Sequence, residues 1–326
     1  MIGNLLGPVN FYGRPRPVLA LHCYIIQAGA FAIAAYLFMS WDFSGMALMP
    51  ADAFTRYVRP TIHNFWKTPW FYWTTLQYIY EFVPRPTLGV LHAMQMTTLV
   101  ALFCGLFGIF PRMAAWTAFL IGTHLVGMLL IASDTIDAST TVMLFMLFIV
   151  ALFPPGAHYQ IGKPAQPMAS STNFHGPVFI LLFFMNAYYF YSGLNKITDY
   201  GVSWVLDAHT ELWSRSAIEN SLFVSSYSTS LWFNSIMSIK ALAFIAAFLI
   251  FFLELIAPIT LFLPRRCPVF LIFFAAMHVS IYLSLGYGYW TNTGADLMLL
   301  PYTAIVARFR SYQGGGQAIG AEQPAE

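Results

Sequence analysis

The sequence predicts an all-α fold, a polytopic transmembrane helical bundle with about eight spanning helices. Hydrophobic residues make up 59% of the 326 positions and charged residues only 9%, whereas soluble domains carry roughly 25% charged residues. Apolar stretches of about 20 residues, the length that crosses the hydrocarbon core of a bilayer, recur along the chain. The net charge of +2 provides no strong basic field for nucleic acid, so the lipid bilayer is the expected partner.

Eight stretches are expected to cross the membrane, and short turns containing proline separate some of them. They are residues 18–39, 88–110, 113–132, 136–153, 177–197, 236–263, 268–288 and 291–307. These stretches place residues 1–312 in a single transmembrane domain. The Gly-rich segment 313–326 is predicted to be a disordered cytoplasmic tail.

The basic residues that flank the short turns predict the orientation, because cytoplasmic loops carry an excess of lysine and arginine. With the N-terminus in the cytoplasm, the following residues lie inside: Arg14, Arg16, Arg112, Lys163, Arg265, Arg266, Arg308 and Arg310. The basic residues of 56–85 oppose this orientation, but long loops obey the rule weakly. We therefore expect a multi-pass cell-membrane protein with both termini in the cytoplasm and with residues 40–87 and 198–235 outside.

The stretch 177–197 carries a polar stripe on one helical face. Asn186, Tyr189, Gly193 and Lys196 are spaced i, i+3, i+7 and i+10, which places them on the same side of a helix. One interpretation is a helix that lines an interior cavity, with the lysine at its exterior mouth. The alternative is that Lys196 extends to the interface beside Asp199, as lysines near helix ends do.

Other ionisable groups also fall inside the predicted spans, where each is expensive and needs a partner or a function. His278 and Tyr282 lie four residues apart in 268–288, and Glu254 lies one turn before Pro258. His278 is either a proton-handling residue or a neutral histidine that bonds a neighbouring helix. Glu254 and Asp296 must be protonated or paired, and pairing with another helix is as reasonable as catalysis.

No nucleotide-binding, metalloprotease or hydrolase motif is present, and no metal site is predicted. Asp207, His209 and Glu211 alternate along the chain, but no other feature supports a metal there. The three cysteines lie far apart, which argues against a disulfide framework or a zinc cluster.

Two motifs carry a family resemblance. Tyr-Ser-Gly-Leu-Asn-Lys-Ile at 191–197, followed by Trp204, resembles the vitamin K-dependent γ-glutamyl carboxylase family, whose bacterial relatives are grouped as HTTM-domain membrane proteins. Met-His-Val at 277–279, followed by Ser-Leu-Gly at 284–286, is similar to the histidine helix of that family. The resemblance covers residues 175–300 best and the earlier helices only loosely.

The resemblance implies a membrane enzyme that uses a quinone or quinol. Lys196 then corresponds to the lysine base, His278 to a histidine of the same cavity, and Trp204 to a structural tryptophan. The cofactor would contact residues around this cavity, namely Asn186, Tyr189, Trp204, Glu254 and Tyr282. Asn195 stands where the carboxylase has the first of two paired lysines. The chain also lacks a large domain after its last predicted helix, so carboxylation of a protein substrate is not expected.

Two functions therefore remain open: a quinone- or lipid-linked enzyme that uses a lysine base, and a non-catalytic membrane subunit or scaffold of a larger complex. A transporter is the weakest alternative, because the sequence shows no inverted repeat. An enzyme should direct Lys196, His278 and Glu254 into one enclosed cavity. A subunit should have these groups paired off.

The predicted orientation leads to a labelling experiment. A cysteine introduced at Asn220 should react with a membrane-impermeant thiol reagent applied to intact cells, and a cysteine at Ala165 should not. Labelling of position 165 without position 220 would show that the orientation is reversed.

Overall fold

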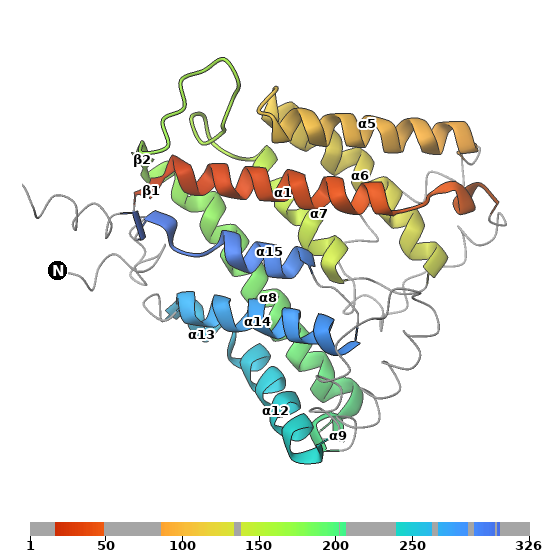
Figure 1. Cartoon of the computed structure of the whole chain (residues 1–326), viewed down its shortest axis with the longest axis vertical. Coiled ribbons are helices and arrows are strands. Elements are labelled where there is room, and N and C mark those ends of the chain that lie inside the picture. The colour runs from red at the N-terminus through yellow and green to blue at the C-terminus, as the bar shows by residue number, and fades with distance from the viewer. Residues whose placement is uncertain are drawn as a thin grey trace, which may run out of the picture.

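The computed structural model describes most of the predicted membrane region as helices (Figure 1). The described residues are 17–48, 86–133, 138–201, 203–206, 239–262, 267–285, 290–303 and 305–306. A helical architecture is what a bilayer requires, because every backbone polar group in hydrocarbon must be satisfied within the protein. Most of the two predicted exterior loops, and the predicted tail 313–326, lie outside the described residues.

The described residues form helices and one small sheet of two strands. In order they are β1 Val18–Leu19, α1 Ala20–Ser40, η2 Ser44–Leu48, α5 Leu88–Leu106, α6 Pro111–Ser133, α7 Ala138–Ala151, β2 Ser170–Ser171, η4 Thr172–Phe174, α8 His175–Tyr200, α9 Ser203–Leu206, α12 Lys240–Ile256, α13 Ile259–Phe262, α14 Cys267–Leu285 and α15 Trp290–Met298.

Each of the eight predicted stretches overlaps at least one of these helices. Among the described residues, three helical stretches are long and apolar enough to span a bilayer: Ala20–Ser40, Leu88–Leu106 and Thr172–Thr198. Three further apolar helices are shorter: Thr140–Ala151, Phe244–Ile256 and Pro268–Ile281. The protein is thus mostly helical, and its apolar helices are compatible with membrane insertion.

Two of the predicted helices are interrupted by proline. The predicted stretch 291–307 begins as α15, which ends at Met298, shortly before Pro301. The stretch 236–263 is divided at Pro258 into α12 and α13. Proline has no backbone N–H to donate and its ring clashes with the preceding turn, so a helix bends or stops there.

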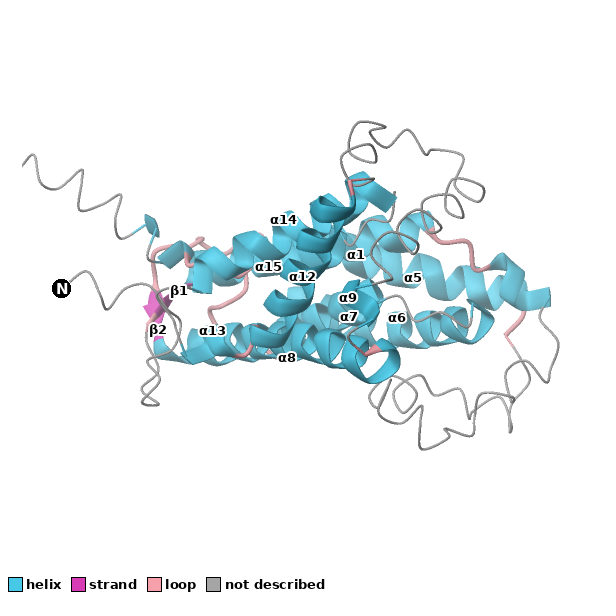
Figure 2. Cartoon of the chain, turned by 90° about the horizontal axis from the view of Figure 1, so that it is seen from below, coloured by secondary structure: helices cyan, strands magenta, loops and turns pink. Residues whose placement is uncertain are grey.

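The helices form two layers. In Figure 1, α5, α1, α15 and α14 lie side by side, and α6, α7 and α8 cross on their far side. Figure 2 shows the two layers from a perpendicular direction. The short helix α12 packs against α8 and contacts α14. Helices α8, α12 and α14 therefore meet in one region of the bundle.

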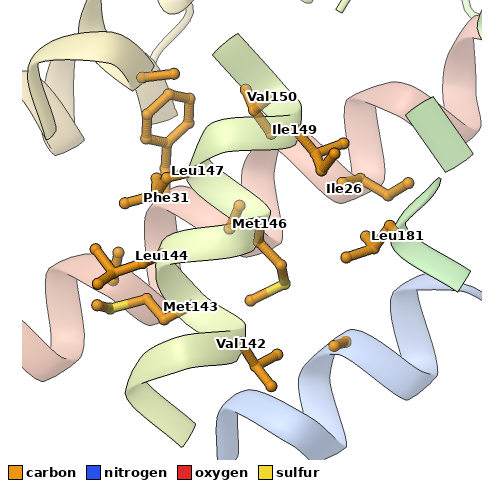
Figure 3. Close-up of a cluster of buried hydrophobic side chains, with 14 of the residues drawn as sticks. Ile26, Phe31, Val142, Met143, Leu144, Met146, Leu147, Ile149, Val150 and Leu181 are labelled. Atoms are coloured by element: carbon orange, nitrogen blue, oxygen red, sulfur yellow. The ribbon is translucent and has the colours of Figure 1, made fainter. Parts of the chain in front are cut away.

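Helix α7 forms the centre of the apolar core. Its side chains from Val142 to Val150 are almost all buried, and they pack against Ile26 and Phe31 of α1 and Leu181 of α8 (Figure 3). A helix that is apolar on all sides is expected in the interior of a bundle rather than on its surface. This packing joins the two layers.

Contacts at one end of the bundle join distant parts of the chain. The two strands pair antiparallel, with Val18 opposite Ser171. The backbone N–H of Leu19 donates to the Thr303 hydroxyl at 3.2 Å, and His22 Nε2 lies 2.9 Å from the carbonyl oxygen of Met298. The beginning of α1, the beginning of α8 and the segment after α15 therefore lie at the same end.

Helix α1 also approaches α5 closely at Gly105. A Cβ atom at this position would overlap the ring of Phe31, which is completely buried. The Gln27 side chain donates to the Gly105 carbonyl at 3.2 Å and to the Tyr159 carbonyl at 3.1 Å. Gly105 thus permits both the ring packing and an interhelical hydrogen bond.

We expect Gly105→Ala to lower the free energy of unfolding by about 1–3 kcal/mol, because an overpacked core must shift its side chains. Gly176→Ala is the matched control, since a Cβ there meets no atom within 4 Å. The control should be neutral or slightly stabilising, as an unstrained Gly→Ala change in a helix usually is. Equal stability of the two variants in detergent unfolding curves would contradict the close packing at Gly105.

Candidate functional site

Most of the polar stripe of α8 faces the interior of the bundle. Asn186 and Tyr189 are 3% and 2% exposed. Gly193 packs directly against α12: a Cβ atom at Gly193 would lie 3.1 Å from the Glu254 Cβ and from the Leu255 backbone nitrogen. The absence of a side chain at Gly193 therefore lets α12 approach α8 and bring Glu254 to the stripe.

Lys196 and Glu254 form an ion pair across this contact. The Nζ of Lys196 lies 2.5 Å from Oε2 of Glu254, and the two side chains are 18% and 6% exposed. The Ser192 hydroxyl donates to Glu254 Oε1 at 3.2 Å, and Lys196 donates to the Ser192 oxygen at 3.1 Å. Three side chains on adjoining helices thus form a small hydrogen-bonded cluster.

The contact with Glu254 directs the Lys196 side chain toward α12. The side chain is mostly buried and its ammonium bonds to a carboxylate of another helix. The side chain of Asp199, the partner in the alternative interpretation, is outside the described residues. Because two opposite charges in a low-dielectric interior compensate one another only at close range, Lys196 and Glu254 depend on each other.

A second cluster lies around Asp296 of α15. The hydroxyl of Tyr189 donates to Asp296 Oδ2 at 2.6 Å, and Nδ1 of His278 lies 3.6 Å from the same oxygen. The ring of Phe274 stacks on the Tyr189 ring, with centroids 4.0 Å apart. Asp296 is completely buried. The polar groups that face its Oδ2 come from Tyr189 of α8 and His278 of α14.

The two clusters are close enough to interact. His278 and Tyr189 both lie within electrostatic range of the Glu254 carboxyl, which Lys196 contacts directly. One region of the bundle therefore contains a lysine, two carboxyl groups, a histidine and a tyrosine. Such a set can hold, exchange and transfer protons.

Asn186 bonds to a different partner. Its side-chain nitrogen donates to the carbonyl oxygen of Leu182 at 2.8 Å, and the hydroxyl of Thr260 donates to its Oδ1 at 2.5 Å. Thr260 lies in α13, just after the break at Pro258. These bonds satisfy the amide and hold α13 against α8.

The sequence-predicted site residues are thus only partly brought together. Lys196 and Glu254 are in contact, as are the rings of Tyr189 and His278. Asn186 lies on the same face of α8 as Tyr189 and Lys196. Trp204 lies in α9 and Tyr282 in α14, but their side chains are outside the described residues.

Sequence reasoning missed two residues that bond to the predicted site residues. Ser192 lies one turn before Lys196, so its position at i−4 is a signal that could have identified it. Thr260 has no such signal, because its partner Asn186 lies 74 residues away. Asp296 was recognised as a buried acid, but its bond to Tyr189 was not predicted. Among the described residues, no group of three His, Cys, Asp or Glu side chains is placed to hold a metal.

Comparisons with protein-family models, with curated proteins and with solved structures found no match to this chain. The fold and the clusters define a mostly helical protein with ionisable side chains in its interior. The resemblance to the HTTM and carboxylase family rests on the motif residues alone.

We expect Tyr189→Phe to lower the free energy of unfolding by about 1.5–3 kcal/mol, the range for a hydrogen bond to an ionisable group. The substitution retains the aromatic ring and removes only the donor to Asp296. Tyr24→Phe is the control, because no hydrogen bond from its hydroxyl is found within the described part of the chain. A double-mutant cycle with Asp296→Asn measures the coupling, and a coupling energy near zero would contradict the bond.

Proposed function

We propose that this protein is an integral membrane enzyme of the HTTM, carboxylase-like type, which acts on a lipid-borne quinol with Lys196 as its base. The observation that supports the proposal best is the buried contact between Lys196 and Glu254, beside Tyr189, His278 and Asp296. Ionisable groups inside a membrane bundle are costly and mark functional sites more often than surface groups do. The motif resemblance supplies the class of substrate.

Glu254 gives Lys196 a route to its basic form. A protonated ammonium cannot accept a proton, so a lysine base must first become a neutral amine. Transfer of one proton from Lys196 Nζ to Glu254 Oε2, along the bond that joins them, converts the ion pair into an amine and a carboxylic acid. The amine then takes the hydroxyl proton of the quinol, which leaves an ammonium and a quinol oxyanion.

Ser192 and His278 support this exchange in different ways. The Ser192 hydroxyl donates to the second carboxyl oxygen of Glu254, so it orients the carboxyl toward the lysine. His278, within electrostatic range of Glu254, would respond to the charge of that carboxyl as the proton moves. A quinol dissolved in lipid would reach the cluster laterally, between helices.

The proposed location is the cell membrane, with eight spanning helices and both termini in the cytoplasm. The contacts of Leu19 with Ser170 and with Thr303 support this topology. They hold segments that follow the N-terminal arginines and precede the C-terminal arginines at the same end of the bundle.

A second function is favoured by the same ion pair. Lys196 and Glu254 satisfy one another, which is the arrangement expected of a structural contact in a non-catalytic subunit or scaffold. The two functions differ in what the pair must do: a structural pair needs opposite charges at the two positions, whereas a base needs an amine at position 196.

The experiment therefore compares Lys196→Arg, Lys196→Ala, Glu254→Gln and the charge swap Lys196→Glu with Glu254→Lys. The full chain is purified in lipid nanodiscs and supplied with short-chain naphthoquinol and benzoquinol in the presence of dioxygen. We expect Lys196→Arg to assemble normally and to lose roughly 10²–10⁴-fold in the rate of quinol consumption, the usual effect of removing a general base.

The variants that break the pair provide the structural comparison. Lys196→Ala leaves Glu254 buried without its partner and should destabilise the protein by about 3–5 kcal/mol. The charge swap should restore the unfolding curve without restoring quinol consumption. If wild type consumes no quinol and the swap restores full function in a complementation assay, the pair is structural and the subunit function is the correct one.

A further inference from the structure

Helix α15 is a polar element in the interior of the bundle. It consists of nine residues, Trp290–Met298, of which the following are buried: Thr291, Asn292, Thr293, Ala295, Asp296 and Met298. It packs against α14, α1 and α7. A polar helix in this position requires partners for its side chains, because unsatisfied polar groups are costly where water is absent.

Three oxygen atoms of α15 are buried without such a partner. Within the described part of the chain, Thr291 Oγ1, Asn292 Oδ1 and Asp296 Oδ1 make no hydrogen bond. Asn292 and Asp296 are four residues apart, so they lie on one helix face at successive turns. An amide oxygen and an ionised carboxylate oxygen only accept hydrogen bonds. The pair therefore needs a donor or a cation, not another acceptor.

An ionised Asp296 also needs a positive charge or a proton nearby. The only ion-pair contact of Asp296 among the described residues is with His278 Nδ1, which faces the other oxygen, Oδ2, at 3.6 Å. From α8, Tyr189 also faces Oδ2. From α1, His22 bonds the Met298 carbonyl, and α7 has no titratable side chain. Within the described part of the chain, no lysine or arginine contacts Asp296 Oδ1.

We propose that Asn292 and Asp296 form an intramembrane binding site for one small cation, a proton or a sodium ion. With a proton, Asp296 is a carboxylic acid whose Oδ1–H donates to the amide oxygen of Asn292. With sodium, both oxygens coordinate the ion. Oxygen ligands inside helical bundles suit such hard cations.

A bound water molecule accounts less well for the same atoms. The three oxygens have essentially no accessible surface, so there is no room beside them for a body the size of water. A proton needs no space, and a dehydrated sodium ion is smaller than water. The inference concerns Asp296 Oδ1 and Asn292 and is independent of any quinol chemistry at Lys196.

The experiment has one measurement for each cation, both on the full chain in lipid nanodiscs. Infrared spectra in H₂O and D₂O report a buried carboxylic acid. If the site holds a proton, an acid carbonyl band is lost in Asp296→Asn, persists in the control Glu254→Gln, and moves to higher frequency in Asn292→Leu.

Thermal unfolding in NaCl, KCl and choline chloride at equal ionic strength reports sodium. If the site holds sodium, NaCl alone raises the midpoint by several degrees, and this rise disappears in Asp296→Asn and Asn292→Leu.

Either result supports the site and identifies its cation. Wild-type protein that shows neither a buried acid band nor a sodium-dependent midpoint overturns the proposal, and this outcome needs no folded variant. A band or a sodium effect that persists in Asp296→Asn also overturns it. Neither readout uses quinol, so failure here is distinguishable from failure of the proposed enzyme activity.

Discussion

The close approach of α8 and α12 at Gly193 is the constraint on which the polar interior depends. A side chain at this position would meet the Glu254 Cβ and the Leu255 backbone at 3.1 Å, and would push the helices apart. The Lys196–Glu254 contact would then lengthen. In a medium of low dielectric constant the attraction between two charges falls off with distance while the cost of their desolvation remains. Gly193 thus permits the close helix contact that brings Glu254 to Lys196.

The same requirement explains the other buried polar contacts, because each one satisfies a group that has no water to bind. Gln27 bonds the carbonyls of Gly105 and Tyr159, and Asn186 receives the hydroxyl of Thr260. Apolar packing against lipid gives helices little preference for one neighbour over another, since lipid tails are as apolar as leucine. Hydrogen bonds of fixed geometry supply that preference. They join elements far apart in sequence and select one arrangement of the helices.

The sequence predicts the helices and the inward face of α8, because both depend on local periodicity. Asn186, Tyr189 and Lys196 fall on one side of any α-helix, whatever packs against it. The partners could not be predicted in this way. Glu254 lies 58 residues from Lys196 and Asp296 lies 107 residues from Tyr189, so each contact depends on how whole helices pack. Asp199, the candidate partner next to Lys196 in the sequence, has its side chain outside the described residues, and the contact described joins Lys196 to Glu254 on another helix. The number of spans is less predictable, because a break such as Pro301 shortens a helix without changing its composition much.

The two buried carboxyl groups have different surroundings. Glu254 has a lysine in direct contact and a serine on its other oxygen, so both of its oxygens are used and its charge is compensated. Asp296 has a tyrosine and a histidine on one oxygen and no protein partner on the other among the described residues. A compensated carboxyl can orient its neighbour and exchange one proton with it. A carboxyl group with an oxygen that makes no hydrogen bond can accept one from a donor or bind a cation. When two carboxyl groups of one protein lie in different environments, one can act as a proton donor and the other as a proton acceptor. His278 lies within electrostatic range of Glu254 and 3.6 Å from Asp296 Oδ2, so its charge acts on both carboxyl groups.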